Sequence, residues 1–385
     1  MRYIGKGKSI NLSSSIVGKI TDPNCSRVEE FSILKAEKFD PLFYTYKLPF
    51  IIKENLNTSF YDSTQGTGVY SFNKIDELHD GDYVIISPNG SVSSIFIPKS
   101  EHNSLYVTSM CNNNCIMCSQ PPCYRNDIDE LYNLNCKLLD LLDNVTAIGI
   151  TGGEPTLLGS KLYFLLEKII EKFPACQIHI LTNARTFVWD EYARLIGSLG
   201  NSNISFGIPF LSDSYQIHNF ISQQKNSFPQ SLNGIYNLAN YDQRIELRII
   251  LQQYTVQRIE NIGKFIIKNL PFIEQVSFMG LEMIGRAQIF SNEVWVELED
   301  FLEPLVKTID LLILNGFNVC IFNLPFCLLP ESLWPYCIQS ISEWKRSFFE
   351  FCDFCRKRND CGGVFFSTKG RLENNSKVME FIFNT

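Results

Sequence analysis

The amino-acid sequence predicts an α/β protein, and two patterns support this prediction. Between about residue 104 and residue 315, short β-branched runs alternate six times with stretches of helical periodicity. The chain before this region is rich in strand-like runs, and the chain after it is rich in cysteine. We therefore expect a β-rich N-terminal domain at 1–100, a strand–helix domain at 101–315 and a cysteine-rich C-terminal extension at 316–385.

The N-terminal part contains two strand signals. Residues 83–97 form a hairpin pattern, in which Asn89 and Gly90 supply the primed type of turn that hairpins favour. Residues 42–52 form a second, aromatic strand-like run. We recognise no combination of catalytic residue types here, so we expect the chemistry further along the chain.

The alternating region supplies six strand–helix pairs. The predicted strands span 104–109, 145–150, 177–182, 203–208, 245–252 and 275–280. The predicted helices span about 128–143, 160–173, 188–199, 229–241, 258–269 and 294–315. In barrel-like α/β folds, ligands collect at the carboxyl ends of the parallel strands. Residues at those ends are therefore the first candidates for a functional site.

The first predicted strand leads into three closely spaced cysteines, Cys111, Cys115 and Cys118. A CxxxCxxC loop can supply one thiolate to each of three irons of an iron–sulfur cluster. Such clusters usually take four thiolates, so three would leave one iron open to bind another molecule. The alternatives are a zinc site completed by His102 or Cys123, and three unrelated buried thiols.

The second predicted strand, 145–150, is followed by Gly152, Gly153 and Glu154. Glycines after a strand let the backbone approach a ligand closely. The carboxylate of Glu154 would then face a cationic group. This GGE sequence lies one strand–helix unit after the cysteines, and that order makes the pair of motifs more specific than either alone.

The later strands carry further polar candidates. Asn183 follows the third strand, and Ser205 lies in the fourth. Glu246 and Arg248 share one face of the fifth strand, because side chains alternate along a strand. A buried charged pair is costly unless it is paired or liganded, so Arg248 either bridges to Glu246 or contacts a ligand. His179, in the middle of the third strand, is expected to be a core residue or to pack against a helix.

The C-terminal extension contains a second cysteine set, Cys352, Cys355 and Cys361. A short segment with little core of its own needs a staple such as a metal or a cluster. Cys327 is our choice for the fourth ligand, with Cys337 and Cys320 as alternatives. A four-cysteine zinc site is the alternative to an auxiliary iron–sulfur cluster.

Composition narrows the possible functions. The 385-residue chain is 45% hydrophobic and 19% charged, as in ordinary globular proteins. Its net charge of −7 argues against general nucleic-acid binding. No apolar run approaches the ~20 residues that span a bilayer, and the first residues lack the apolar segment of a signal peptide. Thirteen cysteines without an export signal predict reduced thiols that bind metal, and hence a cytoplasmic protein.

The two motifs together resemble the radical S-adenosylmethionine (radical SAM) superfamily. Within it, the run TSMCNNNCIMCSQPP at 108–122 and the sequence CGGVF at 361–365 are similar to the His-Xaa-Ser system maturases, C component. This resemblance covers roughly residues 100–370. It implies a partial (β/α)6 barrel and an enzyme that cleaves S-adenosylmethionine reductively to a 5′-deoxyadenosyl radical.

The resemblance also implies cofactors and partners. The cofactors are a 4Fe–4S cluster with an open iron, S-adenosylmethionine and an auxiliary iron–sulfur cluster in the C-terminal extension. The substrate is a ribosomally made precursor peptide with His-Xaa-Ser repeats. A partner maturase and a flavodoxin or ferredoxin reductant are expected, whereas a membrane or nucleic-acid partner is not. The remaining alternatives are a radical SAM enzyme acting on a small molecule or nucleotide, and a zinc-stabilised binding protein without enzymatic activity.

The resemblance further assigns roles to single residues. Cys111, Cys115 and Cys118 would bind the first cluster. The residues expected to bind S-adenosylmethionine are Met117, Gly152, Gly153, Glu154, Asn183, Ser205, Arg248 and Leu281. Of these, Met117 and the backbone near Leu281 would lie beside the adenine. Cys327, Cys352, Cys355 and Cys361 would bind the auxiliary centre.

Overall fold

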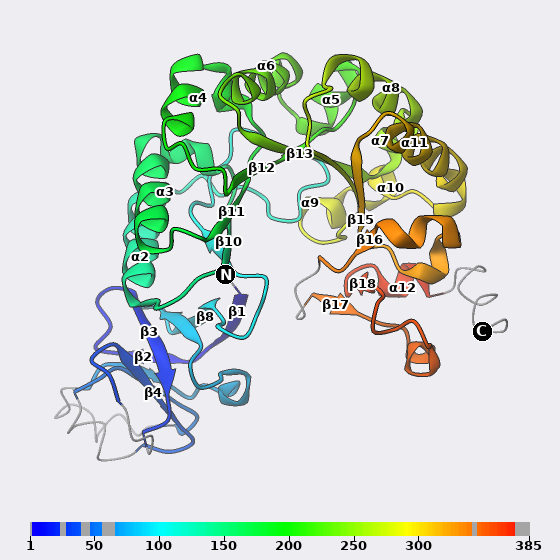
Figure 1. Ribbon diagram of the computed structural model, residues 1–385. Coiled ribbons are helices and arrows are strands. Elements are labelled where there is room, and N and C mark those ends of the chain that lie inside the picture. The colour runs from blue at the N-terminus through cyan, green and yellow to red at the C-terminus, as the bar shows by residue number, and fades with distance from the viewer. Residues whose placement is uncertain (1, 24–27, 40–46, 56–65, 341–344, 374–385) are drawn as a thin grey trace. The chain divides into compact units, whose positions relative to one another are not determined.

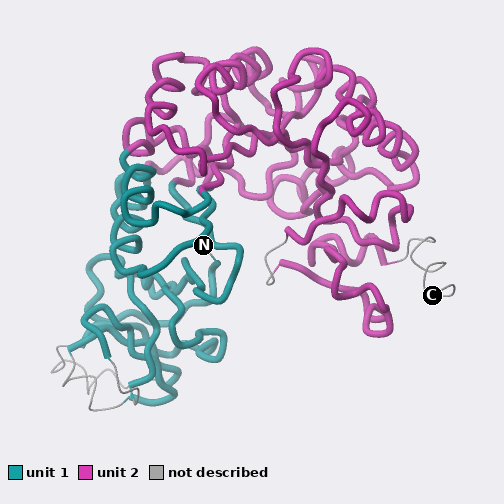
Figure 2. The backbone as a smooth tube through the Cα atoms, viewed as in Figure 1, with its two compact units in different colours: residues 1–107, 127–151, 164–177 teal, residues 108–126, 152–163, 178–385 magenta. Residues whose placement is uncertain are grey.

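The computed structural model describes residues 2–23, 28–39, 47–55, 66–340 and 345–373. The chain forms two compact units, shown in teal and magenta in Figure 2. Unit 1 comprises the described parts of 1–107, 127–151 and 164–177, and unit 2 comprises those of 108–126, 152–163 and 178–385. Figure 1 labels many of the helices and strands of the two units.

Unit 1 is built on a mixed sheet that has eight strands within the described residues, in the order β1-β8-β7-β3-β4-β5-β6-β2. Strands β3 to β6 pair in parallel with one another, and the other pairs are antiparallel. The strands are β1 (Arg2–Lys6), β2 (Lys8–Ile10), β3 (Ile16–Thr21), β4 (Ser32–Ala36), β5 (Phe50–Ile52), β6 (Gly68–Tyr70), β7 (Tyr83–Ile86) and β8 (Ser91–Phe96). A 3-10 turn, η2 (Ile75–Glu77), precedes β7.

The core of this sheet consists mainly of β-branched side chains. Ile20, Ile33, Ile51, Val69 and Val84 are almost completely buried in one apolar cluster. Branched side chains fit the pleated surface of a sheet and bury much apolar area there. The predicted β-rich N-terminal region is therefore confirmed. Of the strand-like run 42–52, the last three residues form β5, and 42–46 lie outside the described residues.

The predicted hairpin at 83–97 is confirmed as β7 and β8, but its turn differs from the prediction. Of the two expected turn residues, only Gly90 has a positive φ, of +82°. Gly90 N donates to Ser87 O at 2.8 Å. The reason is Pro88, whose ring holds φ near −65° and so favours an ordinary type I turn, closed by a glycine in the left-handed region. The prediction of a primed turn was therefore wrong.

The rest of unit 1 contains two parallel strands and helical segments. Strand β9 (Ser104–Tyr106) pairs in parallel with β10 (Ala147–Thr151), so that Gly149 lies opposite Ser104. Helix α2 (Ile128–Leu141) connects the two strands along the chain. Helix α3 (Ser160–Lys172) begins in unit 2 and continues into unit 1.

Unit 2 is built on parallel strands in the order β16-β15-β14-β13-β12-β11. The strands are β11 (Gln177–Leu181), β12 (Ile204–Pro209), β13 (Arg244–Leu251), β14 (Gln275–Gly280), β15 (Asn318–Phe322) and β16 (Cys337–Ile338). The longer helices between them are α4 (Asp190–Gly197), α5 (Tyr215–Ser222), α6 (Ser227–Asn240), α8 (Ile259–Asn269) and α11 (Leu302–Leu314). Each predicted strand of this part is present and is followed by a helix, so the predicted α/β class is confirmed.

Helix α8 shows why these helices form where the sequence places them. Ile259, Ile262 and Ile266 are buried, and their spacing of three and four residues puts them on one face. Glu260 in the first turn and Lys268 in the last turn complement the helix dipole. Sequence periodicity alone therefore determines the position and orientation of such a helix.

Two helical segments differ from the prediction. Helix α5 was not predicted, because its eight residues are fewer than the window over which helical periodicity is visible. The single helix predicted at 294–315 is divided into α10 (Ser291–Val294), the turn η5 (Leu298–Asp300) and α11. Acidic residues at 297–300 explain the division, because they stabilise a helix that begins just after them.

Short elements complete unit 2. They are η3 (Pro155–Leu158), η4 (Arg185–Val188), α7 (Gln253–Val256), α9 (Arg286–Ile289), η6 (Phe326–Leu328), η7 (Glu331–Tyr336), β17 (Arg346–Ser347), η8 (Glu350–Phe354), β18 (Val364–Phe365) and α12 (Lys369–Leu372). Strands β17 and β18 pair with each other in antiparallel fashion. Among the described residues, no helix has the length and hydropathy needed to cross a bilayer.

Candidate functional site

The first three cysteines lie on one irregular segment of unit 2, residues 108–119, which we call the cysteine loop. Asn114 N donates to Ser222 O at 3.0 Å, and Ile116 N donates to Ile221 O at 2.9 Å. These carbonyl groups belong to the last turn of α5, where a helix leaves carbonyls without internal partners. The end of α5 therefore holds the middle of the cysteine loop.

Gly152 and Gly153 hold the beginning of the cysteine loop. Gly153 N donates to Thr108 O at 2.7 Å. A Cβ atom on Gly152 would lie 2.5 Å from Thr108 O, and a Cβ atom on Gly153 would lie 2.1 Å from Met110 O. Only glycine fits at such distances. The sequence suggested that these glycines admit a ligand, and in the structure they admit the cysteine loop.

The carboxylate of Glu154 is buried, with 1% of the residue exposed. Its Oε1 accepts hydrogen bonds from the hydroxyls of Thr156 at 2.7 Å and Thr182 at 2.5 Å. Its Oε2 accepts a hydrogen bond from Asn183 N at 2.8 Å. Burial raises the pKa of Glu154, and these donors oppose that shift. Glu154 therefore links the segment after β10 to the residues that follow β11.

The residues after β11 also reach the cysteine loop. Asn183 Nδ2 donates to Asn112 Oδ1 at 2.6 Å and lies 4.0 Å from Cys111 Sγ. Arg185 Nη1 donates to Asn112 O and, at 2.7 Å, to Asn113 Oδ1. The predicted site residue Asn183 is thus beside the first cysteine, and Arg185 binds the two residues that follow it.

A second arginine holds the other half of the cysteine loop. Arg286 N donates to Cys118 O at 2.9 Å, and Arg286 Nε donates to Cys115 O at 3.1 Å. The preceding Gly285 has a φ of +60°, and a Cβ atom there would lie 2.8 Å from Cys118 O. The segment after β14 can approach the cysteines this closely because a glycine precedes the arginine.

The three thiols share a buried environment. Burial raises the pKa of Cys111 to about 12, and the charge of Glu154 adds to that shift. Burial also raises the pKa of Cys115 and of Cys118. A charge on Cys118 raises the pKa of the other two thiols further. A metal or cluster that binds them must therefore displace their protons.

Met117 and Leu281, the expected neighbours of the adenine, pack in one apolar cluster. They are 8% and 7% exposed. A cavity of about 40 Å³ lies beside Leu281 and is also lined by Gly280 and Asn323, which end or follow strands of the parallel sheet. The structure therefore brings these two predicted residues together at the carboxyl ends of the strands.

Ser205 and Arg248 belong to a separate polar network within the strands. His179 Nδ1 lies 2.9 Å from Ser205 Oγ, and His179 Nε2 lies 3.1 Å from Glu246 Oε2. Arg248 Nε lies 3.7 Å from Glu246 Oε1. The expected Glu–Arg bridge is thus present. His179 was expected to be a core residue or to pack against a helix; it is half-buried, and its ring joins two polar side chains.

The two charged side chains of this network, Glu246 and Arg248, differ in how well their charges are stabilised. Burial by itself would raise the pKa of Glu246, but the hydrogen bond from His179 and the charge of Arg248 lower it below its usual value. Burial lowers the pKa of Arg248, although the charge of Glu246 opposes this shift. Among the described residues, Arg248 Nε has no hydrogen-bond partner. A buried donor of this kind is a candidate ligand contact.

The sequence-predicted residues therefore fall into two groups. The first group lies on the cysteine loop, beside it, or in the apolar cluster that packs around Met117. Its members are Cys111, Cys115, Met117, Cys118, Gly152, Gly153, Glu154, Asn183 and Leu281. The polar contacts of Ser205 and Arg248 run instead to His179 and Glu246.

Sequence reasoning missed four residues that organise the site: Arg185, Arg286, Thr156 and Thr182. Thr182 ends a predicted strand, and Arg185 lies three residues further on, so their position at a strand end was a usable signal. Arg286 lies 171 positions from Cys115, and no local pattern links the two.

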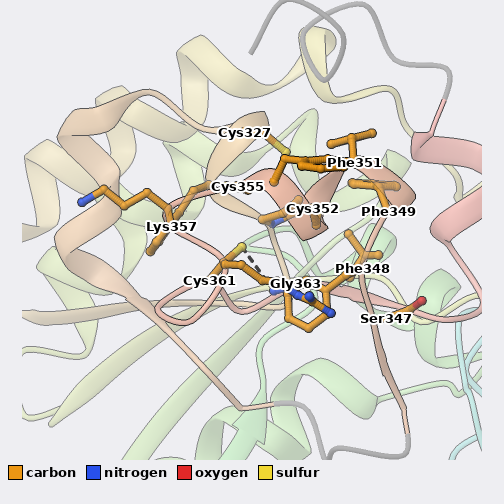
Figure 3. A pocket seen from close by; sticks show the side chains of 15 residues that line it. Cys327, Ser347, Phe348, Phe349, Phe351, Cys352, Cys355, Lys357, Cys361 and Gly363 are labelled. Carbon is orange, nitrogen blue, oxygen red and sulfur yellow. Dashed lines mark hydrogen bonds between the residues drawn. The ribbon is translucent and has the colours of Figure 1, made fainter. Parts of the chain in front are cut away.

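The second cysteine set gathers around a cavity of about 230 Å³ (Figure 3). The cysteines that line it are Cys327, Cys352, Cys355 and Cys361, together with several phenylalanines. Burial raises the pKa of Cys327 to about 12, and charges on Cys361 and Cys352 contribute to that shift. Of the four residues, Cys327 comes from η6 and Cys352 from η8, so the cavity joins two 3-10 turns.

The alternative fourth ligands lie elsewhere. Cys320 lies in β15, where burial and the charge of Glu246 raise its pKa. Cys337 is the first residue of β16, and burial and a charge on Cys361 raise its pKa. Neither lines the cavity of the second cysteine set. Across the described residues, no three His, Cys, Asp or Glu side chains are grouped tightly enough to hold one metal ion.

Comparison with known proteins gives a curated relative and several solved structures. The chain is 30% identical over 177 residues to the uncharacterized protein MJ0907 of Methanocaldococcus jannaschii, which covers 43% of this chain and 58% of that protein. It is similar to Streptococcus suis SuiB bound to S-adenosylmethionine, at 14% identity and a TM-score of 0.47, over 66% of this chain and 54% of SuiB. It is also similar to native anSMEcpe with bound AdoMet, at 18% identity and a TM-score of 0.43, over 57% of this chain and 62% of that one. The chain thus spans little more than half the length of MJ0907 and of SuiB.

A family model also matches the chain. The model described as the radical SAM superfamily matches residues 105–266. This range contains the cysteine loop, the GGE sequence, Asn183 and Arg185, whose contacts are described above. Residues 105–266 are thus similar to the radical SAM superfamily.

Proposed function

We propose that this protein is a radical SAM enzyme that modifies a ribosomally made precursor peptide of the His-Xaa-Ser type. The observation that carries the proposal is the cysteine loop, which holds three thiols within eight positions and whose backbone and side chains are bound by the GGE segment and by the residues after β11. When bound, the cluster and S-adenosylmethionine supply one-electron reduction and a 5′-deoxyadenosyl radical. The chain's own residues position both groups.

The residues present fit such a cluster. Three thiols from one loop can each bind one iron, and no fourth protein thiolate is required where a ligand takes the open position. The three thiols are partly buried. Two polar groups would orient the methionyl part of S-adenosylmethionine. They are the side chain of Asn183, which lies beside Cys111, and the carboxylate of Glu154, which accepts a hydrogen bond from the backbone of Asn183. Met117 and Leu281 offer an apolar surface for the adenine.

We also propose that Cys327, Cys352, Cys355 and Cys361 bind an auxiliary iron–sulfur cluster. Four thiols around one cavity match the usual four-thiolate ligation. The mutual effects on the pKa of Cys327 support its choice over Cys320 and Cys337 as the fourth ligand. Structural zinc at the same four thiols is the rival interpretation.

The peptide substrate rests on the resemblance of residues 108–122 and 361–365 to the His-Xaa-Ser maturases. On this proposal a partner maturase completes the system, and a flavodoxin or ferredoxin delivers one electron per cleavage. The rival interpretation is a radical SAM enzyme for a small molecule or nucleotide. A peptide requirement separates the two, because a small-molecule enzyme would not respond to His-Xaa-Ser repeats.

The test is anaerobic reconstitution with iron and sulfide, followed by reduction with dithionite in the presence of S-adenosylmethionine. We expect 5′-deoxyadenosine from the wild type and none from the variant in which Cys111, Cys115 and Cys118 are alanine. Cys176→Ala is the matched control, since it also removes a buried thiol but lies in unit 1. Addition of a His-Xaa-Ser repeat peptide should increase 5′-deoxyadenosine and change the peptide mass. Stoichiometric zinc without iron would contradict the proposal, and turnover without any change of the peptide would contradict its substrate.

A further inference from the structure

Two arginines contact the cysteine loop from segments that are far apart in the sequence. Arg185, in η4, donates to Asn112 O, next to the first cysteine. Arg286, in α9, donates to Cys115 O and binds Cys118 O through its backbone. One arginine thus holds the first half of the cysteine loop, and the other holds the second half.

Each arginine is itself held in place. Arg185 Nε donates to Gln230 Oε1 of α6 at 2.8 Å. The guanidinium of Arg286 lies 5.0 Å from the ring centroid of Phe290. Because a guanidinium has several donors in one plane, a single arginine can be anchored and still bind the cysteine loop. A second contact therefore fixes each arginine beside the cysteine loop.

The two arginines also place positive charge beside the cysteines. The guanidinium of Arg185 binds the carbonyl next to Cys111, and the guanidinium of Arg286 binds the carbonyl of Cys115, so each charge lies close to thiolates that would bind the cluster. Reduction adds one negative charge to a cluster bound by these thiolates. Nearby positive charge favours that reduced form, because net charge and hydrogen bonding set the potential of a cluster.

We propose that Arg185 and Arg286 are positioning residues that shape the cysteine loop before a cluster binds and then make that cluster easier to reduce. This inference rests on the proposed function, because it assumes a cluster at Cys111, Cys115 and Cys118. It adds a role for two residues that hold no iron. Both roles follow from the same contacts and are measured separately.

The first measurement uses the protein without a cluster. Hydrogen exchange of residues 108–119, followed by mass spectrometry, is compared for the wild type, Arg185→Gln and Arg286→Gln. Each variant loses charge-assisted hydrogen bonds to the cysteine loop, so we expect exchange there to be roughly tenfold to hundredfold faster. Arg244→Gln is the control: this arginine also forms a two-point contact, with Glu274 at 2.8 and 2.7 Å, but at the amino end of β13.

The second measurement is the reduction potential of the reconstituted cluster. The relevant paramagnetic signal is the one that changes when S-adenosylmethionine is added, which separates it from an auxiliary centre. Removing one charge should disfavour the one-electron reduction about tenfold, equivalent to about 59 mV. Arg185→Lys and Arg286→Lys keep the charge, so their potentials should return toward that of the wild type while exchange stays fast, because lysine lacks the planar fork.

The outcomes separate the inference from the function on which it rests. Wild-type protein without iron at the cysteine loop would overturn the proposed function. A wild-type cluster combined with unchanged exchange and unchanged potential in all four variants would overturn the arginine roles alone. Equal shifts of potential in the Gln and Lys variants would overturn the effect of charge. If Arg185→Gln does not fold, as judged by circular dichroism, the Arg286→Gln and Arg286→Lys variants test the inference.

Discussion

The two cysteine sets of unit 2 are held in different ways. Backbone groups of the cysteine loop bond to α5, to the glycine segment after β10, to Arg185 and to Arg286, which are far apart in the sequence. In the second set, Cys352 N donates to Phe349 O and Cys355 N donates to Cys352 O, both within one short turn. The first set is thus shaped by tertiary contacts. The second is shaped mainly by local turns around a cavity, with one longer-range hydrogen bond between the backbone of Phe326 and Cys361.

This difference indicates what each set needs from a metal. A loop whose amides are bound by the surrounding protein keeps its shape when its thiols are empty. Short turns around a cavity have little core of their own, so a bound metal or cluster would supply part of their folding free energy. We therefore expect the first set to need the metal for chemistry, and the second set to need it also for structure.

The largest expected effect comes from emptying the second set. In Cys352→Ala/Cys355→Ala, the segment from 326 to 372 should lose its iron and become sensitive to protease, because its staple is absent. In Cys111→Ala/Cys115→Ala, the first iron should be lost while the protease pattern stays that of the wild type. Iron and sulfide analysis with limited proteolysis measures both.

Equal protease resistance of the two double variants would break the comparison. If the Cys111→Ala/Cys115→Ala protein contains zinc in place of iron, the second cysteine set binds a structural metal. That result would contradict an auxiliary iron–sulfur cluster.

A smaller effect is expected when Glu154 becomes Gln. The substitution replaces one carboxylate oxygen, an acceptor, by an NH2 group, a donor. That donor would face either the hydroxyls of Thr156 and Thr182 or the backbone amide of Asn183. Such a mismatch lowers the free energy of unfolding by about 1–3 kcal/mol. Denaturant unfolding should show that loss, and Glu171→Gln, at an exposed position of α3, should not. If Glu154 also contacts S-adenosylmethionine, its affinity should fall roughly tenfold to hundredfold.

Isothermal titration with S-adenosylmethionine then sharpens the comparison. Unchanged affinity with lower stability would leave Glu154 as a structural link and exclude it as a ligand contact.

The smallest effect concerns pH. Burial lowers the pKa of His218 in α5 to about 4, and its Nδ1 has no hydrogen-bond partner within the described residues. A base with a lowered pKa contributes stability that is present above its ordinary value of 6.5 and is lost as pH falls toward 4. We expect a loss of about 2 kcal/mol between pH 7 and pH 5, since each pKa unit corresponds to about 1.4 kcal/mol.

His218→Phe is the informative variant, because His218 packs against Phe210 and Phe228. It should lack this part of the acid sensitivity in urea unfolding. Since the end of α5 holds the cysteine loop, the protection factors of the loop's amides, which correct for slower intrinsic exchange in acid, should fall on acidification in the wild type and less in the variant. The same acid dependence in both proteins would disprove the role of His218.

Much of the fold follows from local sequence patterns. The β-branched runs at 177–182 and 245–252 became β11 and β13, and the spaced isoleucines of α8 became its buried face. These features depend on periods of two and of three to four residues, which are visible in a short window. The break before α11 was missed, because periodicity continued through it while the charges changed.

Part of the site follows from the sequence for the same reason. Three cysteines within eight positions have to lie close together whatever the fold, and a GGE sequence after a strand has to lie at its carboxyl end. Asn183 was found because polar residues at strand ends are candidates for ligand contacts. Each of these inferences used residues that are neighbours along the chain.

Only the tertiary structure decided which distant residues complete the site. It placed Arg286 against Cys115 across 171 positions, surrounded the carboxylate of Glu154 with donors from the residues that follow β11, and joined Ser205 to His179. It also placed Cys327, and neither alternative, around the cavity of the second set. The physical reason is that hydrogen bonding and burial depend on distance in space, and chain spacing determines that distance only over a few residues.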